Sequence, residues 1–146
     1  MGMIKYIPIE MHAHTTHSDG QFTPKQLLKN ALHYGYKALI ITDHNTTSGF
    51  NEANQNSFAR GYLLEGVEWT TFYGHLIVIG AKNNGDWRHL LPVSMDAMLR
   101  QIKHDGGLVG IAHPYNVGGP ICTGCRWEYE VQRWEYVNYI EIWNGP

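Results

Sequence analysis

Histidine side chains gather at the ends of apolar runs in this sequence. Five of the nine histidines in the 146-residue chain hold such positions: His12, His14, His44, His75 and His113. Three carboxylates accompany them: Asp19, Asp43 and Glu68. Imidazole and carboxylate groups are the ligands that divalent metals use in hydrolytic sites. The sequence therefore predicts a metal-dependent hydrolytic site.

The spacing of His12 and His14 suits a shared metal ion. Residues two apart on an extended strand point to the same side, so both imidazoles face one cation. Two surface histidines at a strand end are the alternative for an isolated His-x-His motif. The further histidines and carboxylates at other strand ends favour metal binding.

Strand and helix patterns alternate along the chain and place these side chains. The apolar runs that we predict as strands are 4–14, 38–42, 62–70, 75–81, 108–113 and 139–143. Helical spacing or capping residues predict helices over 23–35, within 45–60 and over 94–106. This alternation predicts a mainly parallel α/β fold. Active sites of such folds lie at the carboxyl ends of the strands, where four of the five histidines fall.

Bulk properties exclude several functions. The net charge is −2 and no basic stripe is present, which makes nucleic-acid binding an unlikely role. No apolar run approaches the roughly 20 residues of a membrane span, so we expect no membrane partner. The N-terminus lacks the pattern of a secretory leader, and we expect a cytoplasmic protein.

The ordered motifs resemble a known family. The stretch 12–20 reads His-Ala-His-Thr-Thr-His-Ser-Asp-Gly; Thr42-Asp43-His44, a strand-ending Glu68 and Ala112-His113-Pro114 follow. In this order they are similar to the PHP (polymerase and histidinol phosphatase) superfamily. The stretch 66–75 further resembles the branch that includes carbaryl-hydrolysing enzymes.

The resemblance implies a distorted barrel of seven β/α units with up to three divalent ions, Zn, Mn or Fe, in a multinuclear site. It places His12 and His14 at the first metal, with Glu68 bridging the first and second. His75 and His113 complete the second, and Asp19 and His44 hold the third. Glu68 and Asp43 are the candidate catalytic residues; Asp43 either orients a ligating histidine or caps a helix.

The resemblance also implies hydrolysis by a metal-activated water. The expected function is that of a phosphoesterase acting on a small, phosphorylated ester. A carboxyl-ester or carbamate hydrolase is the alternative, and a non-catalytic metal-binding PHP module is an alternative of another class. Arg126 is the candidate substrate-binding residue, and Arg133 is a second arginine available to an anion; surface placement is the other interpretation of both.

The family pattern is incomplete in this sequence. It closes with an Asp-x-His pair, yet no Asp or His follows His113. About five or six strand signals are present, fewer than a closed barrel of seven units has. We therefore expect residues 1–146 to be a single PHP domain that lacks its C-terminal β/α units. A fragment is the first interpretation, and a second chain or a homo-oligomer that completes the barrel is the other.

The remaining cysteines and histidines have less defined roles. Cys122 and Cys125 form a C-x-x-C pair, which is no disulfide framework. Half of a zinc site or a redox pair is one interpretation, and a loop with reduced thiols near the pocket mouth is the favoured one. His17 is expected behind the ligands or in solvent. Surface positions are expected for His33, His89 and His104.

Overall fold

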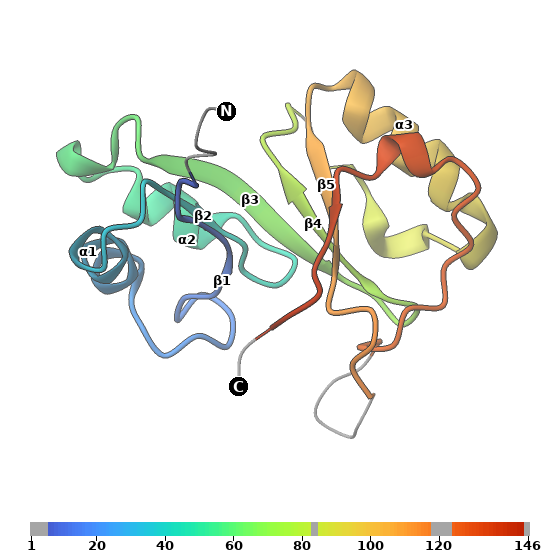
Figure 1. Cartoon of the computed structure of the whole chain (residues 1–146), viewed down its shortest axis with the longest axis horizontal. Helices are drawn as coiled ribbons and strands as arrows, with labels where there is room; N and C mark the ends of the chain where they lie inside the picture. Colours follow the sequence, from blue (N-terminus) through green and yellow to red (C-terminus); the bar gives the residue numbers. More distant parts are fainter. Residues whose placement is uncertain (1–5, 83–84, 118–123, 145–146) are drawn as a thin grey trace, which may run out of the picture. The chain divides into compact units, whose positions relative to one another are not determined.

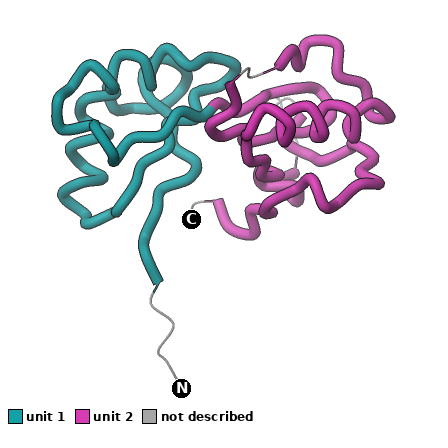
Figure 2. The backbone as a smooth tube through the Cα atoms, turned by 90° about the horizontal axis from the view of Figure 1, so that it is seen from above, with its two compact units in different colours: residues 1–66 teal, residues 67–146 magenta. Residues whose placement is uncertain are grey.

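The computed structural model describes residues 6–82, 85–117 and 124–144. The chain divides into two compact units, Met1–Gly66 and Val67–Pro146, which Figure 2 shows in different colours. Strand β3 (Leu63–Thr70) contributes its first residues to unit 1 and its last residues to unit 2. Six strands are present in the described residues, in agreement with the five or six that the sequence predicts.

Unit 1 contains a parallel three-stranded sheet. Strand β1 (Ile9–Ala13) pairs with β2 (Ala38–Ile41), and β2 pairs with the start of β3. Helices α1 (Pro24–His33) and α2 (Ser48–Ala53) make the two connections and lie next to each other in Figure 1. Parallel neighbours need such crossover connections. The parallel α/β organisation that the sequence predicts is confirmed here.

Helix α1 begins where its capping signals predict. The Thr23 hydroxyl accepts a hydrogen bond from the Gln26 N–H, and the Gln26 side chain accepts one from the Thr23 N–H, which makes a capping box. The apolar side of α1 packs on β2: Leu28 and Ala31 are buried together with Leu39 and other side chains of one core cluster.

Unit 2 departs from a parallel arrangement. Its strands have the order β3-β4-β5-β6, where β4 is His75–Ile79, β5 is Leu108–Ala112 and β6 is Tyr139–Ile140. Strand β4 is antiparallel to β5, and β5 is parallel to β6. The antiparallel register sets His75 opposite Ala112. A histidine that opens one strand therefore lies beside a histidine, His113, that follows another.

Helix α3 (Met95–His104) covers the sheet of unit 2 (Figure 1). Met95, Leu99 and Ile102 are buried against Trp69 and strand residues in the second core cluster. Ser94 occupies the N-cap position of this helix, but its hydroxyl makes no capping bond and donates to the Leu91 carbonyl. This hydrogen bond belongs to the short 3-10 helix Pro92–Ser94 that precedes α3.

In the part of the chain that the structure describes, no helix has the length and apolar character needed to cross a membrane.

Leucines on α1 provide a matched test of the core of unit 1. Leu28 is fully buried, whereas Leu32, one turn later, is 40% exposed. We expect Leu28→Ala to lower the free energy of unfolding by about 2–5 kcal/mol, because it leaves a cavity in a packed core. Leu32→Ala is expected to cost much less. Urea denaturation measures both, and equal losses would contradict the packing of α1.

Candidate metal centre

Unit 1 brings together four of the predicted metal ligands. We call His12, His14, Asp19 and His44 the first donor group. The Nε2 atoms of His12 and His14 lie 3.0 Å apart, as expected for side chains that leave a strand on the same side. The ring of His44 stacks on that of His14, with centroids 4.4 Å apart. Three imidazoles therefore converge at the carboxyl ends of β1 and β2.

Asp19 joins this group from the loop after β1. Its two carboxylate oxygens lie 3.6 Å from His14 Nδ1 and 3.5 Å from His44 Nε2. The Asp19 side chain is 68% exposed, so its carboxylate keeps its access to water and ions. A carboxylate with three imidazoles is a donor set that Zn, Mn and Fe accept.

Asp43 braces the loop that carries Asp19. It is fully buried, and its carboxylate accepts hydrogen bonds from the Thr15 N–H (2.7 Å), the Thr15 hydroxyl (2.8 Å) and the Ser18 hydroxyl (2.7 Å). Its hydrogen bonds therefore go to the loop, not directly to a histidine. The link to a histidine runs through Ser18, whose hydroxyl lies 3.4 Å from His14 Nδ1. Helix α2 has Thr47 at its N-cap position, so Asp43 is not its cap.

Gly49 leaves the space that this network needs. A Cβ atom at Gly49 would lie 2.0 Å from Asp43 Oδ2 and 2.7 Å from Thr15 Oγ1. A side chain at this position would push the carboxylate away from the loop. The close approach of α2 is thus part of the loop's geometry.

Unit 2 brings together the other three predicted ligands. We call Glu68, His75 and His113 the second donor group. Glu68 Oε1 lies 2.9 Å from His75 Nδ1 and 3.1 Å from His113 Nε2. All three side chains are buried, with exposed fractions of 0%, 3% and 9%. The antiparallel pairing of β4 with β5 explains why His75 and His113 meet.

The chemistry of the second donor group suits a divalent cation. A carboxylate removed from water is costly unless a positive charge lies beside it. Two imidazoles and a carboxylate oxygen are also the usual ligands of catalytic zinc and related metals. The group therefore fits the divalent metal that the sequence predicts.

Glu141 supports the backbone of His113, a role that sequence reasoning missed. His113 has φ of 27°, in a region that residues other than glycine seldom adopt. Its N–H donates to Glu141 Oε2 at 2.9 Å, and the Glu141 N–H donates to the Ile111 carbonyl. The position of Glu141 within the predicted strand 139–143 was the available signal.

Tyr139 is a second residue that sequence reasoning missed. Its hydroxyl is buried without a hydrogen-bond partner among the described residues. Burial, with smaller contributions from Glu141 and Glu68, raises the pKa of the Tyr139 phenol above its usual value. The ring lies over Gly110, where a Cβ atom would come within 2.0 Å of it. A neutral phenol therefore borders the second donor group.

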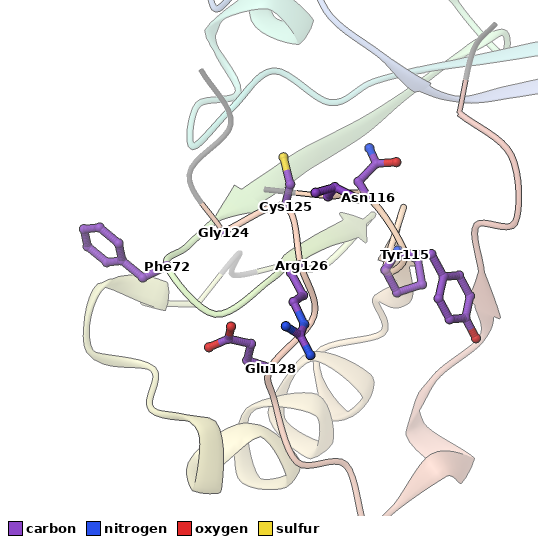
Figure 3. A pocket seen from close by; sticks show the side chains of 9 residues that line it. Phe72, Tyr115, Asn116, Gly124, Cys125, Arg126 and Glu128 are labelled. Atoms are coloured by element: carbon purple, nitrogen blue, oxygen red, sulfur yellow. The ribbon is translucent and has the colours of Figure 1, made fainter. Parts of the chain in front are cut away.

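A pocket of about 570 Å³ lies in unit 2 (Figure 3). Its lining includes Phe72, Tyr115, Asn116, Cys125, Arg126 and Glu128. Cys125 belongs both to this lining and to a set of possible metal ligands with His75 and His113. The predicted substrate-binding residue Arg126 thus lines the same pocket as Cys125, a residue that lies close to two predicted metal ligands.

Cys125 differs from the favoured expectation. It is disulfide-bonded, not a reduced thiol. Two nearby thiols can bind a metal or be oxidised to a disulfide, and the spacing of a C-x-x-C pair does not decide between these states. Cys122 lies outside the described residues.

The other histidines lie where the sequence predicts. His17, His33, His89 and His104 are all exposed. His17 Nδ1 and Nε2 each lie 2.8 Å from a polar atom of α2, Ser48 Oγ and Glu52 Oε2. Arg133 is also exposed and its guanidinium pairs with Glu135.

Comparison with known proteins identifies the family. The family model of the PHP domain matches residues 10–108, which is more than half of the chain. The match includes six of the seven predicted ligands, and His113 lies beyond it. The chain belongs to the PHP family. The PHP resemblance of its sequence motifs is thereby confirmed.

Relatives of this PHP chain include enzymes of phosphoester chemistry. The 5′-3′ exoribonuclease Rnm of Salmonella typhimurium is 37% identical over 67 residues, 44% of this chain and 23% of that protein. The 3′,5′-nucleoside bisphosphate phosphatase of Chromobacterium violaceum is 34% identical over 77 residues, 49% of this chain and 27% of that protein. The chain thus spans about a quarter of the length of these two relatives.

Solved structures show the same PHP fold. A candidate metal-dependent phosphoesterase from Bifidobacterium adolescentis has a TM-score of 0.66 and 18% identity, covering 95% of this chain and 78% of that one. A two-domain protein from Bacteroides vulgatus, containing a predicted PHP-like metal-dependent phosphoesterase, has a TM-score of 0.61 and 20% identity, covering 82% and 42%. The fold of this chain is therefore that of a partial PHP-type barrel, as predicted.

Asp43 and Asp19 are expected to respond differently to truncation. Asp43→Ala leaves two buried donors of Thr15 and the part-buried Ser18 hydroxyl without their acceptor. It should lower the free energy of unfolding by about 3 kcal/mol, because each buried unsatisfied group costs about 1–3 kcal/mol. Asp19→Ala removes an exposed carboxylate and should change stability by no more than about 0.5 kcal/mol. It should instead weaken Zn²⁺ binding. Thermal unfolding of the two variants that shows equal losses would contradict the bracing role.

Glu141 is expected to control metal affinity through His113. Glu141→Ala should weaken Zn²⁺ binding about 10–100-fold, the range known for contacts that orient a ligand. Glu141→Gln keeps an oxygen acceptor and should weaken it less. Calorimetric titration measures the dissociation constants, with Glu130→Ala, an exposed glutamate of the same unit, as the control. An unchanged constant for Glu141→Ala would exclude the role.

Proposed function

We propose that this PHP chain is a metal-dependent phosphoesterase. The observation that carries the proposal is the second donor group, in which a fully buried carboxylate oxygen lies within 3.1 Å of two imidazole nitrogens. Membership of the PHP family and relatives named as an exoribonuclease and a bisphosphate phosphatase support the same chemistry.

Each unit has its own set of proposed metal ligands. His12, His14, Asp19 and His44 would hold ions in unit 1, and Glu68, His75 and His113 would hold an ion in unit 2. Zn, Mn and Fe suit the imidazole and carboxylate type of these ligands, and up to three such ions are proposed. Divalent metals activate water and polarise a phosphoester when bound. Asp43 serves by fixing the loop that presents Asp19, and Glu68 by keeping His75 and His113 together.

The pocket lined by Arg126 and Cys125 is the proposed substrate site. Arg126 contributes a guanidinium that suits a phosphate group. Phe72 and Tyr115 are strongly exposed aromatic side chains of the same lining and offer apolar contacts to the rest of the substrate. These features support a small, phosphorylated ester as the substrate class.

A substrate panel tests the proposal. We expect the chain loaded with Mn²⁺ or Zn²⁺ to hydrolyse p-nitrophenyl phosphate or bis-p-nitrophenyl phosphate, and to lose this activity after chelation. Naphthyl carbamate serves as the probe for the alternative carbamate hydrolase. Activity on the carbamate with none on either phosphate would overturn the proposal. Metal binding without activity on any of the three would favour a non-catalytic module.

Glu68→Gln tests the central carboxylate. The amide matches the carboxylate in shape but removes its charge. We therefore expect phosphatase activity to fall by about a hundredfold or more, which exceeds the loss expected when a residue that only hydrogen-bonds to a metal ligand is replaced. Glu130→Gln, on an exposed glutamate of unit 2, is the matched control and should leave activity unchanged. Full activity in folded Glu68→Gln would refute the metal-binding role of this residue.

A further inference from the structure

Cys125 is placed to act as a further ligand at the second donor group. One potential ligand atom each from His75, His113 and Cys125 lies within 4.8 Å of the others. All three residues are buried, Cys125 with an exposed fraction of 3%. Two imidazoles and a thiolate sulfur in such a cluster form a familiar zinc-binding set.

An extended segment aims the sulfur at the histidines. From Cys125 to Tyr129 buried and more exposed residues alternate, as expected for extended backbone. A β-bridge between Tyr115 and Arg126 and a hydrogen bond from the Glu128 N–H to the Tyr73 carbonyl hold the segment in place. Figure 3 shows the side chains of Cys125 and Arg126 on opposite sides of this segment. The thiol position is therefore fixed by the backbone, and the guanidinium is left to the pocket.

The oxidation state of Cys125 decides whether its sulfur can bind a metal. A thiolate is the metal ligand, whereas a sulfur in a disulfide has no negative charge to offer. Cys125 is disulfide-bonded in the structure. Cys122 is the other cysteine of the sequence. The cluster with His75 and His113 therefore gains or loses one ligand with the redox state.

We propose that Cys125 is a redox-dependent ligand of the metal held by His75 and His113. A dithiol reductant gives two electrons and two protons to the disulfide and becomes a disulfide itself, which leaves Cys125 as a thiol. Metal binding then replaces the thiol proton, which passes to solvent. Oxidation by a disulfide of the same class reverses the step and removes the sulfur ligand.

The two states differ in metal preference. With the thiolate, the set of sulfur, imidazole and carboxylate suits tetrahedral Zn²⁺. Without it, only nitrogen and oxygen ligands remain, and these suit Mn²⁺ and Fe²⁺ as well as Zn²⁺. Reduction thus shifts the metal preference of this position toward zinc. This inference deepens the proposed function, since it concerns the metal of the same site.

Cobalt titration tests the ligand directly. Co²⁺ takes tetrahedral zinc positions, and a bound thiolate adds a sulfur-to-cobalt charge-transfer band in the near ultraviolet. The samples are the full chain reduced under nitrogen with a phosphine, the same chain oxidised, Cys125→Ser, and Cys122→Ser, which leaves Cys125 as the sole cysteine. We expect the band in reduced wild type and in Cys122→Ser, and its loss in oxidised wild type and in Cys125→Ser.

The affinities provide the second readout. Removal of the sulfur by oxidation or by Cys125→Ser should weaken Co²⁺ binding at least about tenfold, the lower limit for contacts that merely orient a ligand. Reduced Cys122→Ser without the band would overturn the proposal, even if Cys125→Ser fails to fold. A band that survives in Cys125→Ser would overturn it as well. Failure of phosphatase activity alone would count against the proposed function and leave the spectrum as the test of the ligand.

Discussion

The burial of the Glu68 carboxylate is the constraint on which unit 2 depends. A charge removed from water must be compensated nearby, and the two imidazoles around Glu68 Oε1 would share that compensation with the proposed metal ion. Several features of the fold follow from this need. The antiparallel register sets His75 beside the end of β5, and Glu141 holds His113 in an uncommon backbone conformation.

Unit 1 meets a different requirement, because the side chains of the first donor group must be held in position and remain accessible to solvent. Asp19 lies on an exposed loop, and loops are mobile unless their polar groups are bound. The buried carboxylate of Asp43 binds three donors of that loop, and Gly49 lets α2 approach closely enough to keep it there. One aspartate thus serves as the anchor so that another can remain open to solvent.

Much of this organisation could be predicted from the sequence. The alternation of strands and helices indicated the α/β class, and the positions of histidines at strand ends indicated the two donor groups. The roles of Glu141 and Asp43 could not be predicted, because both depend on hydrogen bonds between residues about 28 positions apart. The state of Cys125 could not be predicted either, since the spacing of two cysteines suits a metal and a disulfide alike.

The chain belongs to the PHP family and spans about a quarter of the length of its two phosphoester-hydrolysing relatives. The claim that this chain binds divalent metal through its own side chains is therefore the one to test first. Elemental analysis of the purified chain after dialysis against metal-free buffer is the most direct measurement. We predict at least one tightly bound divalent ion per chain, and a chain that retains none would contradict the account.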